Sequence, residues 1–240
     1  QADNVVAIGN SAAYSLTTAS NNVAIGFSAM KVNTTGERNI AIGTNAMDDT
    51  DAGSTSLGSA DNVFMGHNAG GGTWVDAASN RNISIGNYTM DSALNGALDN
   101  VAIGHYALSS ITSGDYNTAL GSNAGLSITT GGSNVVIGYL AGDTMTDTDN
   151  TVLIGKDAGQ AINSSDANGA VAIGYQALHD LTSGQYPVAV GYRALGDLTT
   201  GDRNTSVGYG ALDAITTGND NTALGWGAGC LLYTSPSPRD

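Results

Sequence analysis

Cysteine is almost absent from this chain, and basic residues and histidine are scarce. The repeats described below hold no cysteine, so disulfides say nothing of the redox compartment. Seven Lys and Arg stand against 21 Asp and Glu, a net charge of −14, which excludes a basic surface for nucleic acid or an anionic bilayer. The three histidines, His67, His105 and His179, lie on different repeats without a Cys or His partner at ligand spacing, so we expect no metal site.

Long apolar runs and catalytic groupings are also missing. No apolar stretch approaches the length of a membrane span, which predicts that this segment does not insert into a membrane. No nucleophile, base or cofactor cradle stands out, so we expect neither enzymatic activity, catalytic residues nor a cofactor. Charged residues make up only 12% of the chain, and the surface must therefore consist largely of Asn, Ser, Thr, Asp and Gly. Such a surface suits an extracellular or virion fibre.

Glycine is abundant, and thirteen glycines mark thirteen copies of one short module between Asn4 and Gly229. Most of the twelve intervals between them are 17 residues, and the longest are 23 and 20. A period this short is typical of stacked structural rungs. The central glycines are Gly9, Gly26, Gly43, Gly66, Gly86, Gly104, Gly121, Gly138, Gly155, Gly174, Gly191, Gly208 and Gly225.

Each module predicts one short β-strand just before its central glycine. The third residue upstream is always Val, Ile or Thr, the first is always a large aliphatic residue, and the one between is Ala or Ser in ten copies. This alternation predicts a strand with two different sides. We expect the large pair to face a packed layer and the small residue to face a segment that approaches very closely.

The rest of the module predicts a corner, a second apolar segment and a turn. Gly-x-x-Ala follows the strand in twelve copies, and a further apolar residue such as Ile111 or Leu198 follows in many. The spacing of that segment suits either a strand or a helical turn. Six modules then carry Thr-Thr-Gly or Thr-Ser-Gly, whose glycine we expect to supply a positive φ.

Residues 1–229 therefore predict one all-β, parallel β-solenoid of about 13 rungs of ~17 residues. With strands about 4.8 Å apart, the rod would be roughly 60 Å long. We expect the two longest intervals to bulge as loops, the first holding Asp48 to Asp51 and the second Trp74. Few large apolar residues per rung leave a thin core, which favours several chains wound together and predicts a homo-oligomer.

The last eleven residues, 230–240, break the period. They read CLLYTSPSPRD and contain two of the three prolines. This string resembles the translation of a transposase sequencing adapter over its whole length, so we exclude it from the predicted fold. We expect the natural C-terminus, and the natural N-terminus before Gln1, to lie outside this sequence.

Two groups of fibrous proteins resemble this chain. Asn-Val-Ala-Ile-Gly, at Asn22–Gly26 and Asn100–Gly104, is similar to the head repeat of trimeric autotransporter adhesins. The longer form at Asn117–Gly131 resembles repeats in phage and bacterial tail fibres. The adhesin resemblance implies a trimeric, left-handed β-roll, and neither resemblance identifies a ligand.

Asparagine and aromatic residues recur at fixed places and are the candidate surface features. Asn stands four residues before the central glycine in nine copies, which indicates a stacked amide ladder closing a turn rather than a binding site. The residue after the central glycine is aromatic or His in eight copies, which indicates either a ladder that seals the rod or an exposed stripe whose rings stack on sugars. Our candidate ligand-binding residues on that line are Tyr139, Tyr175, Tyr192, Tyr209 and Trp226.

Other interpretations fit less well. The segment Asp48 to Asp51 lacks the spacing of a calcium loop and predicts a solvated loop. A left-handed β-helix acyltransferase needs its hexapeptide about three times per coil, whereas this chain has it once per module. An ice-binding solenoid needs Thr-x-Thr on one face, and the adjacent threonines here point to opposite faces.

Taken together, the sequence predicts a structural or adhesive fibre segment at a cell surface or on a virion. It would be a homotrimer that presents a repeated surface to a glycan or protein receptor. The alternative is a passive spacer whose recognition domain lies elsewhere. Ice binding and acyl transfer are further alternatives that the sequence favours less than these two.

Overall fold

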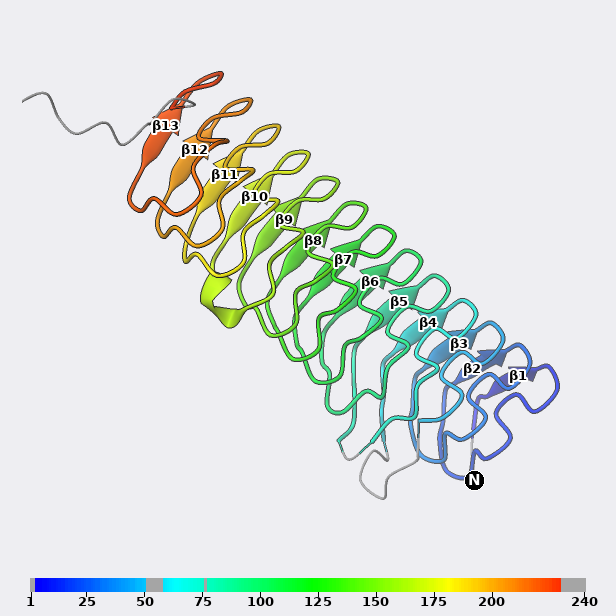
Figure 1. Cartoon of the computed structure of the whole chain (residues 1–240). Coiled ribbons are helices and arrows are strands. Elements are labelled where there is room, and N and C mark those ends of the chain that lie inside the picture. Colours follow the sequence, from blue (N-terminus) through cyan, green and yellow to red (C-terminus); the bar gives the residue numbers. More distant parts are fainter. Residues whose placement is uncertain (1–2, 51–57, 76, 230–240) are drawn as a thin grey trace, which may run out of the picture.

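The chain folds as an elongated β-solenoid in which every predicted strand is present. The computed structural model describes residues 3–50, 58–75 and 77–229. Thirteen three-residue strands form one parallel sheet in sequence order, with β1 and β13 at opposite ends of the rod (Figure 1). The strands are β1 (Val6–Ile8), β2 (Val23–Ile25), β3 (Ile40–Ile42), β4 (Val63–Met65), β5 (Ile83–Ile85), β6 (Val101–Ile103), β7 (Thr118–Leu120), β8 (Val135–Ile137), β9 (Val152–Ile154), β10 (Val171–Ile173), β11 (Val188–Val190), β12 (Thr205–Val207) and β13 (Thr222–Leu224).

Equivalent residues of successive rungs lie directly beside each other. Val101 pairs with Thr118 and Ile103 with Leu120, and this register holds along the whole sheet. The prediction of a parallel β-solenoid for residues 1–229 is thus confirmed for the described residues. The left-handed winding and the trimeric state stay predictions, and the adapter-like segment 230–240 lies outside the described residues.

The second apolar segment is neither strand nor helix. Beyond the strand, each rung is built from turns, and residues with positive φ recur at fixed places, as at Tyr116, Asn123 and Leu108. Within the described ranges the one helical element is the 3₁₀ turn η1 (Ser165–Ala167), which holds the extra residues of a 19-residue interval. Each rung therefore has one hydrogen-bonded strand and a turn-built return path.

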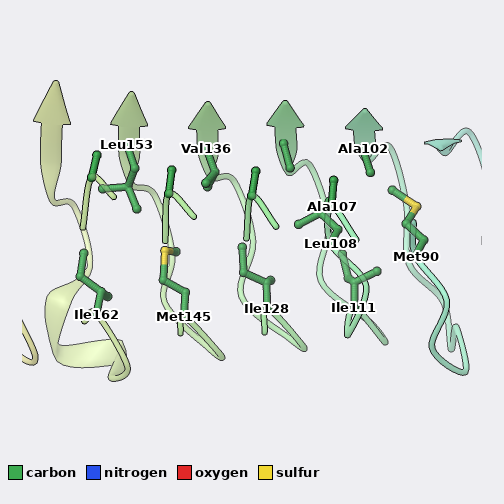
Figure 2. Close-up of a cluster of buried hydrophobic side chains, with 14 of the residues drawn as sticks. Met90, Ala102, Ala107, Leu108, Ile111, Ile128, Val136, Met145, Leu153 and Ile162 are labelled. Atoms are coloured by element: carbon green, nitrogen blue, oxygen red, sulfur yellow. The ribbon is translucent and has the colours of Figure 1, made fainter. Parts of the chain in front are cut away.

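The interior of the rod is a stack of small and medium apolar side chains. In the rung around Gly104, Ala102 from the strand, Ala107, Leu108 and Ile111 are all fully buried. Their equivalents in neighbouring rungs line up in rows along the rod (Figure 2). The small middle residue of the strand thus faces a close segment, as predicted.

The large pair of each strand lies on the opposite side, and its predicted place in a packed layer is wrong for the single chain. Those side chains form the outer face of the sheet, where most are partly exposed and, away from the end rungs, the relative exposure reaches 46% at Leu120 and 38% at Ile85. The returning turn comes so close that only the small residue fits inside. The large pair is therefore left to cover the outside.

Where the middle strand residue is large, glycine compensates. Phe64 and Leu153 occupy that place, and the fourth residue after the central glycine of the same rung is then Gly70 or Gly159. A Cβ built on either glycine would overlap the large side chain, within about 2.5 Å of Phe64 in the first case and 2.8 Å of Leu153 in the second. Interior volume is thus conserved within a rung.

Trp74 does not sit in a bulging loop. It is fully buried, its ring centroid lies 5.5 Å from that of Phe64, and its indole N–H donates to the Gly70 carbonyl at 3.0 Å. The 20-residue interval is therefore folded inward by its one large aromatic residue.

Glycine in the Thr-Thr-Gly turns has a different role from the one we predicted. Gly114, Gly131 and Gly201 do not have positive φ. A Cβ on Gly114 would instead fall on the carbonyl oxygen of Gly131, one rung further on. Close approach of backbones, rather than a left-handed conformation, requires glycine there.

Candidate functional surfaces

The asparagine line is a structural ladder inside the rod. Asn100, Asn117 and Asn134 are fully buried. The Asn117 side-chain amide donates to Asn100 Oδ1 at 3.1 Å and to the Gly131 carbonyl at 2.9 Å, while its Oδ1 accepts from the Asn134 backbone N–H at 3.2 Å. With donors and acceptor engaged, this line offers nothing to a ligand, and the prediction of an amide ladder is confirmed.

The residues after the central glycines do form a continuous line along the rod. Tyr175 stacks on Tyr192 with centroids 5.1 Å apart, and Tyr192 stacks on Tyr209 at 4.7 Å with an interplanar angle of 5°. Lys156 extends the line, because its Nζ lies 5.9 Å from the Tyr139 centroid and 5.3 Å from that of Tyr175. The in-register sheet makes this stacking unavoidable, since equivalent side chains are one strand spacing apart.

Stacking changes what these residues can offer a ligand. Tyr139, Tyr192 and Tyr209 are 41% to 54% exposed and Trp226, one rung beyond Tyr209, is 82% exposed. The facing sides of the stacked rings cover one another, so ring edges and hydroxyls are what solvent reaches. The structure therefore stacks three of the five predicted residues, Tyr175, Tyr192 and Tyr209, and leaves little of their ring faces for a sugar. Tyr139 and Trp226 make no ring–ring contact among the described residues.

A second aromatic cluster lies nearer the N-terminus and was missed in part. His67 and His105 were on the predicted line, but Tyr88 lies between them, with ring centroids 5.1 Å from His67 and 5.9 Å from His105. Tyr106 stacks on Tyr88 at 5.0 Å. Tyr88 and Tyr106 each stand two residues after a central glycine, and that shared place was the signal available in the sequence.

The acidic segment after Met47 is not the solvated loop we predicted. Asp48 is half-buried, and burial, followed by the nearby Asp49 charge, raises the pKa of Asp48 to about 6. Thr50 is almost fully buried, and Asp51 lies outside the described residues. The described part of this segment is thus partly or fully covered rather than solvated.

The same place in other rungs carries carboxylates of similar character. Asp48, Asp91 and Asp143 each stand five residues after a central glycine. Burial raises the pKa of Asp91 and of Asp143 as well. No group of three or more His, Cys, Asp or Glu side chains in the described ranges could hold a metal ion.

The largest uniform surface is the outer face of the sheet. Two side chains per strand over thirteen strands make twenty-six positions, and all are Val, Ile, Leu, Met or Thr. The three threonines, Thr118, Thr205 and Thr222, lie on β7, β12 and β13. The face is roughly 60 Å by 10 Å from the strand spacing and rise, near the upper end of the apolar patches of about 300–600 Å² that monomers expose.

Hydrogen-bonded charge pairs lie away from the outer face of the sheet, along the turn that precedes each strand. Arg38 pairs with Asp61, Arg81 with Asp99 and Arg203 with Asp220, at 2.6 to 2.7 Å between successive rungs. Each arginine holds the pKa of its partner carboxyl below the usual value. These pairs are exposed, so each contributes little to stability.

No helix in the described part of the chain is long and apolar enough to span a membrane. In comparisons with known proteins, no family model matches the chain. Searches of curated proteins and of solved structures likewise gave no match. The geometry of the rod is therefore what carries the functional argument.

Proposed function

We propose that this chain is a structural and adhesive fibre segment that assembles as a homotrimer through the outer face of its sheet. The observation that carries the proposal is the ladder of 23 aliphatic and three threonine side chains on that face, with no charge over thirteen rungs. Apolar surface of this extent is stabilised by burial against another chain. The resemblance to adhesin and tail-fibre repeats favours three copies and a location outside the cell or on a virion.

The fibre would present its other sides, repeated at every rung, to a cell surface. Exposed Tyr, Asn, Thr and Asp side chains suit polyhydroxylated ligands, and the charge of −14 disfavours nucleic acid and anionic lipid. Individually weak contacts gain avidity when three chains and many rungs engage one surface. A glycan or protein receptor would be held in this way, with Tyr139, Tyr175, Tyr192, Tyr209 and Trp226 as the proposed contact line.

The first test is the mass of the chain in solution. One copy is 24.0 kDa, so light scattering should report 72 kDa, three times that value, for a trimer. The variant carrying Ile103→Lys and Ile137→Lys puts two cations on the outer face and should give monomers with unchanged circular dichroism. Thr44→Lys is the matched control, because Thr44 is exposed and occupies the same place in its rung as the natural Lys156.

A mass other than that of a trimer would contradict the proposed assembly and favour one of the alternatives. A dimer of face-to-face sheets would contradict the threefold assembly, and a stable monomer would contradict assembly altogether. A monomer would leave the flat aliphatic face open to water, and thermal hysteresis would then test ice binding. A trimer that retains no glycan on an array and adheres to no cell would support a passive spacer instead of an adhesin.

A further inference from the structure

The turn before each strand carries a line of exposed side chains, which we call the turn line. It consists of the residue five places before each central glycine, and all thirteen have positive φ. On the N-terminal side the line holds the pairs Arg38–Asp61 and Arg81–Asp99 and then Tyr116, and on the C-terminal side it holds Tyr186 and the pair Arg203–Asp220. Its members are Asn4, Asn21, Arg38, Asp61, Arg81, Asp99, Tyr116, Ser133, Asn150, Gly169, Tyr186, Arg203 and Asp220.

Between the two tyrosines the turn line is interrupted by small residues, and the surface is hollowed there. Ser133 and Asn150 follow Tyr116 on the next two rungs. The resulting hollow has a volume of about 280 Å³ and is lined by Tyr116, Ser133, Asn150, Asp115, Asp149 and Thr130, among others. Further along the turn line the Tyr186 ring lies against Gly169, where a Cβ would come within 2.7 Å of the ring.

Two carboxylates are held rigidly in the wall of this hollow. Asp115 Oδ1 accepts from the Leu98 backbone N–H at 2.7 Å, and Asp149 Oδ1 accepts from that of Gly132 at 2.7 Å. In the described part of the chain no hydrogen bond reaches the second oxygen of either carboxylate. Each therefore presents one oxygen that is free to accept a hydrogen bond, and Gly132 lines the hollow between them.

Tyr116 supplies the apolar wall. Its side chain is 60% exposed, and it takes part in none of the ring contacts among the described residues, unlike the stacked tyrosines of the aromatic line. An unstacked ring beside fixed acceptors and hydroxyls is the combination that suits a sugar, because pyranose C–H groups pack on the ring while hydroxyls donate to the carboxylates.

The size and charge of the hollow limit the class of ligand that it could bind. Its volume lies below the range of about 300–1,000 Å³ of drug-sized pockets, which suits a single sugar ring. Asp115 and Asp149 are two rungs apart, roughly 10 Å from the strand spacing, too far to share one metal ion but within reach of hydroxyls at opposite ends of a ring. The named lining residues include two carboxylates and no cation, which disfavours acidic sugars.

We propose that this hollow is a binding subsite for a neutral pyranose, with Tyr116 as the stacking wall and Asp115 and Asp149 as hydroxyl acceptors. The proposal deepens the proposed function of glycan attachment and rests on it. It moves the point of recognition from the stacked aromatic line to the one interruption of the turn line. Three copies per fibre would multiply a weak single-ring affinity.

The test is saturation-transfer NMR of the intact chain with the methyl pyranosides of glucose, galactose and mannose. At least one should receive saturation, and the methyl glycoside of sialic acid should receive much less. Tyr116→Ser should abolish the signal. Asp115→Asn combined with Asp149→Asn should weaken affinity about tenfold, since charge-assisted hydrogen bonds are lost.

These substitutions are chosen to leave the fold intact. Asn80 and Asn168 already form the same side-chain contact to the preceding rung, accepting from Ala60 and Asp149 N–H groups at 2.7 Å. Ser133 shows that the turn line tolerates serine at positive φ. Asp202→Asn, at the same place in another rung, and Tyr14→Ser, an exposed tyrosine in the first rung, are the matched controls and should bind like the unmodified chain.

The outcomes separate this subsite from the wider function. No saturation from any neutral pyranoside, or a signal that survives both variants, would overturn the subsite. Glycan retention on an array that Tyr116→Ser leaves unchanged would also overturn it, while the adhesive function would stand. Saturation lost in the variants, with no retention by arrays or cells, would support the subsite and contradict adhesion.

Discussion

Single residues set how closely the rungs stack. All thirteen central glycines have φ between 123° and 143°, and at each one that has a following rung a Cβ would fall on the carbonyl of the next rung. Glycine is therefore required at these positions for two separate reasons. The backbone conformation is one that L-residues avoid, and the contact with the next rung leaves no room for a methyl group.

The last rung separates these two demands. Gly174→Ala should destabilise the chain by well over the roughly 1–3 kcal/mol expected for strained φ alone, because its Cβ also strikes the Gly191 carbonyl. Gly225→Ala has the same strained φ of 123° but nothing within 4 Å, so it should show the strain alone. Urea unfolding would measure both, and equal losses would show that the backbone contact is irrelevant.

Asp48 makes stability depend on pH in the unusual direction. Because the pKa of this carboxyl is raised to about 6 in the fold, the folded chain binds more protons than the unfolded chain between about pH 4 and 6, and stability falls as pH rises through that window. Asp48→Asn should remove this loss and stabilise the chain by about 1 kcal/mol at pH 7.5, the half-exposed carboxylate being partly screened.

Urea unfolding at pH 4, 5, 6 and 7.5 would measure the gain. The difference between Asp48→Asn and the unmodified chain should be near zero at pH 4 and grow towards pH 7.5. The exposed Asp147, which accepts from Thr146 Oγ1 at 3.2 Å, supplies the control Asp147→Asn. A constant difference across that range would show that the Asp48 charge is not the cause.

At the scale of the element, strand and return path tolerate change unequally. Every strand has three residues whatever the interval between central glycines, and the extra residues of the 19-residue interval accompany η1 in the return path. Length variation is therefore absorbed in the return path, where Ser165 and Asp166 of the η1 turn face solvent.

Insertions would test whether the return path tolerates extra residues better than the strand does. A Gly-Ser pair placed after the exposed Asp166, in the η1 turn between β9 and β10, should cost less than about 1 kcal/mol by loop-closure entropy. One residue placed after Ala189 in β11 should disrupt that rung, since it would move the large residue inward and the small one outward. Circular dichroism melting and limited proteolysis would distinguish them, and similar melting temperatures would contradict the inequality.

At the scale of the molecule, the rod is a one-dimensional stack whose ends lack neighbours. Leu224 and Trp226 in the last rung are 79% and 82% exposed, whereas residues at the same places in central rungs are more covered. Each rung contacts only the rungs beside it, so stability should be highest in the middle.

Hydrogen exchange should show this gradient. Backbone amides of β6 to β8 should be the most protected and those of β1 and β13 the least, because opening an end breaks one interface instead of two. Exchange measured by mass spectrometry on peptic fragments would resolve it. Uniform protection along the rod would indicate that the chain, or its trimer, opens only as a whole.

Part of the fold and of the candidate site could be predicted from the sequence. The central glycines predicted the positions of all thirteen strands, and the recurring asparagine position predicted the amide ladder. Both predictions follow because a fixed period places equivalent residues side by side in any stacked structure. Of the candidate site, the alignment of Tyr175, Tyr192 and Tyr209 follows from the same periodicity. Tyr116 was not singled out, because the period shows that Ser133 and Asn150 follow it on the next rungs but not that the surface beside its ring is hollowed.

By itself, then, the sequence determined the rung number, the strand positions and the in-register columns, since all three depend only on spacing. The tertiary structure decided which side of each strand is inside, because that depends on how closely the return path approaches the sheet. It also decided which ring faces are covered and where the surface is hollowed. A column shows which residues are neighbours, whereas burial and exposed ring faces depend on the distance and direction of the side chains across the rung.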